Sequence, residues 1–145
     1  MVDPLNPGRR AVLVVDDSVE DFETVCEAAR RAQLTVPILN AVNTDAALDL
    51  LADTVVEDFS FMLLDFNLPG VDGLTFLRVL RAHPVYARLP VVVFTASVNP
   101  RDRAAFLAAG ADAFHVKTVR FDECLHTLAG IFHCWLTPTA IVRPQ

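Results

Sequence analysis

The sequence lacks several features that would place it in other common classes of protein. Although 53% of its residues are hydrophobic, no stretch approaches the ~18 unbroken apolar residues that a membrane-spanning helix requires. Lys and Arg number 12 against 18 Asp and Glu, so no basic stripe exists to bind nucleic acid. Cys26, Cys124 and Cys134 are odd in number and lack C-x-x-C spacing, which favours reduced thiols. Together these absences predict a cytoplasmic protein that binds neither membranes nor nucleic acid.

The length of 145 residues fits one domain, which would bury roughly 68–70% of the surface of the unfolded chain. Apolar runs begin near residues 11, 36, 61, 90 and 113, and helical patterns lie between them. We expect a flexible arm over residues 1–10, a domain over residues 11–136 and a short tail over residues 137–145. The arm has no apolar core of the kind that a signal peptide requires.

The apolar runs are continuous rather than alternating, which is typical of buried parallel strands. Strands that alternate with helices predict an α/β fold, here a doubly wound five-stranded parallel sheet. Pro37 lies in the second run and cannot donate a ladder hydrogen bond, which favours an edge position for that strand. The strand order 2-1-3-4-5 satisfies this condition and places the first and third strands side by side.

Chemically active side chains follow four of these runs. Asp16 and Asp17 close the first run, Asp65 the third, Thr95 the fourth and Lys117 the fifth. Because the carboxyl ends of parallel strands meet at one edge of the sheet, this topology brings the five side chains together. Each has a simpler explanation on its own, such as helix capping or turn formation. Their joint position at four strand ends predicts a single site.

The residue types suit the transfer of a phosphoryl group to a carboxylate. Three carboxylates at one sheet edge repel one another, and a divalent cation with oxygen ligands, such as Mg²⁺, relieves that repulsion. Asp65 can act as the nucleophile and form an aspartyl phosphate. The metal and Lys117 would neutralise charge on the transferring group, while the Thr95 hydroxyl would donate to its oxygens.

Four segments resemble the receiver domain of two-component response regulators. They are residues 14–18 (VVDDS), 64–73 (LDFNLPGVDG), 94–97 (FTAS) and 110–117 (GADAFHVK). The resemblance implies a flavodoxin-like receiver domain over residues 11–136, with a sensor histidine kinase that donates its phosphoryl group to Asp65. It also implies that Asp17, Asp65 and the backbone carbonyl of Asn67 bind Mg²⁺ directly, and that Asp16 acts through bound water.

The same resemblance assigns a switching role to two residues and a tuning role to two others. Thr95 is the switch hydroxyl, and Phe114 is the aromatic residue that turns inward with it. The responsive surface would be the fourth helix, fifth strand and fifth helix. Asn67 and Ser97, which lie two residues beyond Asp65 and Thr95, are positions that alter the lifetime of the phosphoaspartate.

One departure from the family pattern concerns the lysine. The family usually has a proline with a cis peptide bond at the next position, whereas Thr118 follows Lys117 here. A cis bond before threonine would cost about 3–4 kcal/mol. Either the fold tolerates that strain, or the loop takes a trans path and repositions Lys117.

The last helical pattern carries one apolar stripe, formed by Phe121, Leu125, Leu128, Phe132 and Trp135. The stripe fits a helix packed on the sheet, and part of it fits a contact with a partner. Residues 132–138 and the short tail resemble single-domain regulators paired with phytochrome-type kinases, which implies a homodimer through the fifth helix and the tail. Because few residues follow that helix, we expect output by contact with an unknown downstream protein or by phosphorelay.

Two other functions fit parts of the pattern. A receiver-fold scaffold that works without phosphorylation is favoured only by the Lys117–Thr118 departure. A haloacid-dehalogenase-type phosphatase also uses an aspartate, a hydroxyl, a lysine and Mg²⁺, but its nucleophile belongs on the first strand. The position two residues after Asp65 would also be a second aspartate, and here it is Asn67. We therefore expect a stand-alone response regulator that catalyses only its own phosphoryl transfer and dephosphorylation.

Overall fold

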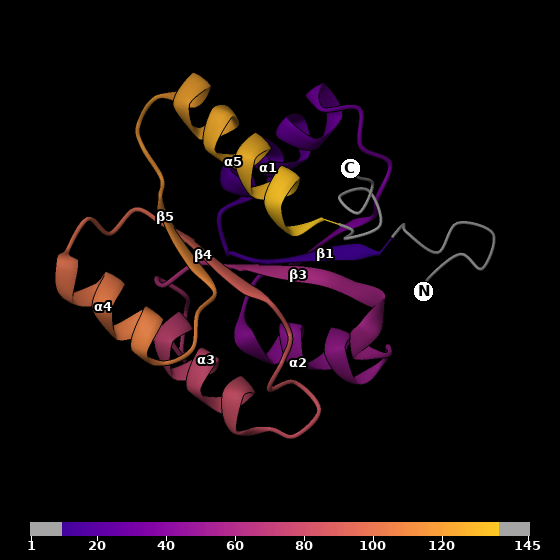
Figure 1. The fold of residues 1–145 in the computed structure, drawn as a ribbon, viewed down its shortest axis with the longest axis vertical. Coiled ribbons are helices and arrows are strands. Elements are labelled where there is room, and N and C mark those ends of the chain that lie inside the picture. The colour runs from indigo at the N-terminus through magenta and orange to yellow at the C-terminus, as the bar shows by residue number, and fades with distance from the viewer. Residues whose placement is uncertain (1–9, 137–145) are drawn as a thin grey trace, which may run out of the picture.

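The computed structural model describes residues 10–136 as a parallel sheet between two layers of helices (Figure 1). The strands are β1 (Ala11–Val15), β2 (Ile38–Ala41), β3 (Phe59–Leu64), β4 (Val91–Thr95) and β5 (Ala113–Val116). Helices α1 (Val19–Arg31) and α5 (Phe121–Trp135) cover one face of the sheet. The other face is covered by α2 (Thr44–Ala52), α3 (Gly73–Ala82) and α4 (Pro100–Ala108), and a 3-10 turn, η1 (Val56–Asp58), precedes β3.

The strand order is β2-β1-β3-β4-β5 and every pairing is parallel, as the sequence predicts. Pro37 immediately precedes the edge strand β2, where its carbonyl accepts a hydrogen bond from the Val12 amide. Val15 of β1 pairs with Leu64 of β3, so the residues after both strands emerge side by side. Thr95 of β4 pairs with Val116 of β5, which sets Lys117 beside the end of β4. The register therefore gathers the predicted site residues at one sheet edge.

Each strand supplies side chains to two separate cores. In β1, Leu13 and Val15 pack towards α2, α3 and α4, whereas Val12 and Val14 pack towards α1 and α5. Helices cover both faces of the sheet, so the side chains on both faces are buried. This explains why the strands are continuous apolar runs in the sequence. No helix among residues 10–136 is long and apolar enough to cross a bilayer.

The fifth helix requires a correction to the predicted interface. Leu125, Leu128 and Phe132 are buried in the core formed with α1 and the sheet, so these three side chains are not available to a partner. Phe121 is 52% exposed, and Trp135 is partly buried against the same core. The apolar stripe is explained mainly by packing within the chain.

The predicted tail, and the predicted arm apart from Arg10, lie outside the described residues.

Side-chain caps mark the starts of the helices that follow the strand-end loops. The Ser18 hydroxyl accepts the Asp21 amide at the start of α1, and the Asp72 carboxylate accepts the Thr75 amide at the start of α3. At the start of α2, the Asn43 side chain accepts the Ala46 amide, and Thr44 is the first helical residue.

Candidate functional site

Three carboxylates meet at the carboxyl edge of the sheet. Asp16 and Asp17 follow β1 and Asp65 follows β3, and their oxygens all lie within 4.8 Å of one another. Asp16 and Asp65 are buried, with 4% and 8% of their surfaces exposed, whereas Asp17 is exposed. A cluster of carboxylate oxygens open to solvent on one side is the ligand set that a hard divalent cation prefers. The acidic residues expected to hold a metal are thus brought together.

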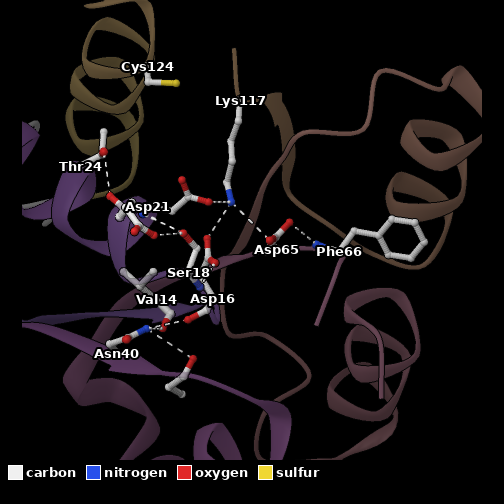
Figure 2. A network of polar contacts seen from close by, with 12 residues as sticks. Val14, Asp16, Ser18, Asp21, Thr24, Asn40, Asp65, Phe66, Lys117 and Cys124 are labelled. Carbon is white, nitrogen blue, oxygen red and sulfur yellow. Dashed lines mark hydrogen bonds and ion pairs between the residues drawn. The ribbon is translucent and has the colours of Figure 1, made fainter. Parts of the chain in front are cut away.

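Lys117 reaches into this cluster from the end of β5 (Figure 2). Its Nζ atom lies 2.7 Å from Asp16 Oδ2, 2.7 Å from Asp21 Oδ2 and 3.3 Å from Asp65 Oδ2. The three N–H donors of the ammonium group therefore each have a carboxylate partner. Burial on its own would lower the pKa of Lys117. The hydrogen bonds to Asp16 and Asp21, with the charges of Asp16 and Asp65, outweigh it and raise that pKa above its ordinary value.

Asp16 is held by backbone and side-chain partners. Burial raises the pKa of Asp16, while the hydrogen bond and charge of Lys117 and the amide of Ser18 partly offset the effect of burial. The Ser18 amide donates to Asp16 Oδ1 at 2.9 Å. From the neighbouring strand β2, the side-chain amide of Asn40 donates to the carbonyls of Val14 and Asp16 at 3.0 and 3.1 Å. Asn40 thereby fixes the end of β1, from which two of the acids project (Figure 2).

The two carboxylate oxygens of Asp65 have different surroundings. Oδ1 accepts the Phe66 amide at 2.7 Å, and Oδ2 faces the Lys117 ammonium. The Phe66 carbonyl in turn accepts the Gly73 amide at 2.9 Å, so the start of α3 supports the loop that carries Asp65. One oxygen is thus fixed by the backbone, and the other is turned to the centre of the site.

Thr95 and Phe114 lie on neighbouring strands. Thr95 is fully buried, and among residues 10–136 its Oγ1 is the buried side-chain polar atom that has no hydrogen-bond partner. The ring of Phe114 is buried against Phe106, with ring centres 5.8 Å apart, and the Arg103 guanidinium lies 5.8 Å from its centre. Arg103 also donates to the Phe114 carbonyl at 3.2 Å. The ring of Phe114 already points inward, and its coupled movement with Thr95 stays a prediction.

The loop after Lys117 takes a trans path, because residues 10–136 contain no cis peptide bond. The Thr118 hydroxyl donates to the Arg120 carbonyl at 3.2 Å, and the Cys124 thiol donates to the Thr118 carbonyl at 3.3 Å. These contacts stabilise the loop without the strain of a cis bond. Lys117 still reaches the acids, so the replacement of the usual proline does not remove it from the site.

The two predicted tuning residues are less closely tied to the acids. Asn67 is exposed on the loop that follows Asp65. The hydroxyl of Ser97 makes a short contact with the Asp102 carboxylate and accepts the Asn99 amide at 3.3 Å. Ser97 is therefore turned towards the start of α4, and the effect of both residues on phosphoaspartate lifetime stays a prediction.

One member of the site, Asp21, was not predicted from the sequence. The structure places the Asp21 carboxylate as close to Lys117 as that of Asp16. The available signal was its position in the first turn of the helix that directly follows the acidic pair Asp16 and Asp17.

The sheet order, the acidic cluster and the strand-end lysine together define a receiver-type α/β domain. A family model described as the response regulator receiver domain matches residues 12–129, and the chain belongs to this family. It is 29% identical over 140 residues to the response regulator Rcp1 of Synechocystis sp., which covers 94% of this chain and 95% of Rcp1. The crystal structure of Mn²⁺-bound Rcp1 superposes with a TM-score of 0.79 at 27% identity, over 88% of this chain and 94% of that one.

Two further similar proteins support fewer conclusions about this chain. The phosphorylated cyanobacterial phytochrome response regulator RcpA has a TM-score of 0.79 over 88% of this chain and 94% of its own, but at 22% identity it supports the fold alone. The gliding motility regulatory protein of Myxococcus xanthus is 31% identical over 109 residues, which is 75% of this chain. This chain spans only 13% of that protein's length.

Proposed function

We propose that this protein is a response regulator whose receiver domain accepts a phosphoryl group on Asp65 from a sensor histidine kinase. The observation that carries the proposal is the contact of Asp65 Oδ2 with the Lys117 ammonium at 3.3 Å inside a cluster of carboxylates. Lys117 is the only lysine in the chain, so no other ammonium side chain can supply this charge. In the transfer, Asp65 forms the new O–P bond, and the P–N bond of the donor phosphohistidine breaks.

The protein's own groups have separate tasks in this reaction. The Phe66 amide holds Asp65 Oδ1, which leaves Oδ2 as the attacking oxygen. Lys117 neutralises negative charge on the transferring group, and the Thr95 hydroxyl can donate to one of its oxygens. A buried hydroxyl without a partner costs about 1–3 kcal/mol, and a phosphoryl oxygen would relieve that cost.

The donor set fits a divalent cation. Asp17, Asp65 and the backbone carbonyl of Asn67 would hold Mg²⁺ directly, and Asp16 would act through bound water. When bound, the cation would neutralise charge on the phosphoryl group. Two observations support this assignment: the carboxylate oxygens of Asp16, Asp17 and Asp65 cluster within 4.8 Å, and the relative Rcp1 has a Mn²⁺-bound form.

An apolar rim around the acids suits a protein as the phosphoryl donor. Val19, Val71, Val98 and Val119 are exposed, and each follows the end of a different strand that borders the site. Exposed apolar side chains around a charged centre are typical of a protein docking surface. A phytochrome-type kinase is the partner that we propose, because residues 132–138 resemble single-domain regulators paired with such kinases.

Output would pass through the face formed by α4, β5 and α5. A hydrogen bond from Thr95 to the phosphoryl group would favour one packing of Phe114. The altered surface would then contact a downstream protein, or a protein of a phosphorelay to which the phosphoryl group passes.

A homodimer through α5 and the tail would use Phe121 and Trp135, since the other three predicted residues are buried. Light scattering on the purified chain tests this point, and a monomer at all concentrations would contradict it.

The proposed function is tested by intact-mass spectrometry after incubation with acetyl phosphate and Mg²⁺. Wild type should gain one phosphoryl adduct that requires Mg²⁺, and Asp65→Asn should gain none. Asp49→Asn, which changes an exposed acid on α2, is the matched control and should behave as wild type. Absence of an adduct on wild type, together with failure to bind beryllofluoride, would instead support a scaffold that works without phosphorylation.

A further inference from the structure

The ammonium group of Lys117 is held more closely by acids that do not accept the phosphoryl group than by the one proposed to accept it. Its distance to both Asp16 and Asp21 is 2.7 Å, against 3.3 Å to Asp65. We propose that Asp21 is a positioning residue that restrains Lys117 away from Asp65 and thereby slows phosphoryl transfer. This inference rests on the proposed function, and it assigns to Asp21 a task beyond the cap of α1.

The direction of the restraint follows from where the two closer acids lie. Asp16 comes from the strand next to that of Asp65, since Val15 pairs with Leu64, so its bond keeps Lys117 beside the acceptor. Asp21 comes from α1, and it approaches the ammonium from the side opposite Asp65 (Figure 2).

The negative charge of Asp21 should slow phosphoryl transfer, as its position beside Lys117 does. The carboxylates of Asp16, Asp21 and Asp65 contact one ammonium, and that of Asp17 clusters with two of them. A phosphate donor therefore approaches a site with excess negative charge. Removal of the Asp21 charge would lower this repulsion and would also free one N–H donor of Lys117 for the phosphoryl oxygens. Asp16 would still anchor the lysine at 2.7 Å, so the site would not lose its cation.

The size of the effect is limited by solvent. The Asp21 side chain is 39% exposed, so water and salt screen its attraction for the lysine. We therefore expect Asp21→Asn to accelerate phosphorylation roughly three- to fivefold at saturating Mg²⁺, and less at high salt. The substitution keeps the Asp21 backbone amide, which donates to the capping Ser18 hydroxyl, so α1 should still begin at the same residue.

A spectroscopic test examines the contact itself. Because Lys117 is the only lysine, protein labelled with ¹⁵N-lysine gives one side-chain Nζ signal that needs no assignment. Asp21→Asn should shift that signal and speed exchange of its protons with water. The matched control is Glu20→Gln, which removes the same charge one residue earlier, where the carboxylate accepts the Ser18 hydroxyl at 3.4 Å. It should leave the signal unchanged, and an equal shift in both variants would overturn the assigned contact.

A kinetic test examines the restraint, by initial rates of adduct formation with acetyl phosphate at saturating Mg²⁺. Asp21→Asn should be faster than wild type, Glu20→Gln should match wild type, and Asp21→Glu should restore the slower rate. The acceleration should disappear when Lys117→Met is introduced beside Asp21→Asn, because Asp21 acts through the lysine.

The outcomes separate this inference from the proposed function. An unchanged or slower Asp21→Asn, or an equal acceleration without Lys117, would overturn the restraint while wild type is still phosphorylated on Asp65. If wild type forms no adduct that depends on Asp65, the proposed function fails first and the inference fails with it.

Discussion

Gly73 packs against the backbone of Asp65 so closely that no side chain fits between them. A Cβ atom at residue 73 would lie 2.2 Å from the Asp65 carbonyl oxygen and 3.0 Å from the Cα atom of Phe66. The Gly73 amide also donates to the Phe66 carbonyl at 2.9 Å. The first turn of α3 therefore presses on the loop that carries the proposed acceptor, and the glycine is required by this approach.

Gly73→Ala should both destabilise the fold and disturb the site. Relief of the overlap must move either α3 or the end of β3, at a cost of about 1–3 kcal/mol in the free energy of unfolding. Urea denaturation measures this cost, and the rate of phosphorylation should fall because Asp65 shifts. The control is Gly130→Ala in α5, where a Cβ has no neighbour within 4 Å and should stabilise by about 0.5–1 kcal/mol. Equal effects of the two substitutions would contradict the close approach.

Thr95→Val should stabilise the protein while it impairs the response to phosphorylation. Valine has a similar shape but no hydroxyl, so it removes the unpartnered buried Oγ1 atom. We expect the free energy of unfolding to rise by about 1 kcal/mol, measured by urea denaturation. Thr95→Ser keeps the hydroxyl and should show no such gain. A loss of stability in the valine variant would mean that the hydroxyl is satisfied in solution.

Arg81 joins three segments at the amino-terminal end of β4, and its loss should be costly. Its guanidinium donates to the carbonyls of Gly110 and Leu89 at 3.0 and 2.8 Å and pairs with Asp112 at 3.1 Å. Arg81→Ala removes the donor from the carbonyls of Gly110 and of the buried Leu89, while Asp112 keeps the Val91 amide, so we expect a loss of about 1–3 kcal/mol in urea denaturation. Arg78→Ala changes an exposed arginine on the same helix and should cost little. Comparable losses would contradict the bridging role.

His115 should titrate below its ordinary pKa of 6.5. Burial is the larger cause, and the charge of Arg103 adds to it. Since the unfolded chain then binds the proton more tightly, this residue's contribution to stability is present above pH 6.5 and is lost as the pH falls through the lower folded pKa. NMR titration of the imidazole measures the pKa, and Arg103→Gln should raise it towards 6.5. A pKa of His115 above 6.5 would contradict this environment.

The sheet and most of the site could be predicted because their signals are local and the topology is restricted. Continuous apolar runs mark strands covered on both faces, and the order 2-1-3-4-5 places the first and third strands together. The pairing of Val15 with Leu64 confirms the consequence for Asp16 and Asp65. The acids, Thr95 and Lys117 could be predicted because each lies at the carboxyl end of a strand, where an apolar run in the sequence stops.

Relationships that depend on packing could not be predicted in the same way. Asp21 and Lys117 lie 96 residues apart, and their contact depends on the path of the loop after β5. That loop takes a trans bond before Thr118, one of two paths that the sequence left open. Periodicity located the apolar stripe of α5, but it did not reveal that Leu128 is covered by the chain's own core.

The most direct test of the account locates the phosphoryl group on the chain. Protein treated with acetyl phosphate and Mg²⁺ is reduced with borohydride, which converts an aspartyl phosphate to homoserine, and its peptides are then sequenced by mass spectrometry. We expect homoserine at position 65 and unmodified aspartate at positions 16, 17 and 21. Homoserine at any of those three positions, with Asp65 intact, would contradict it.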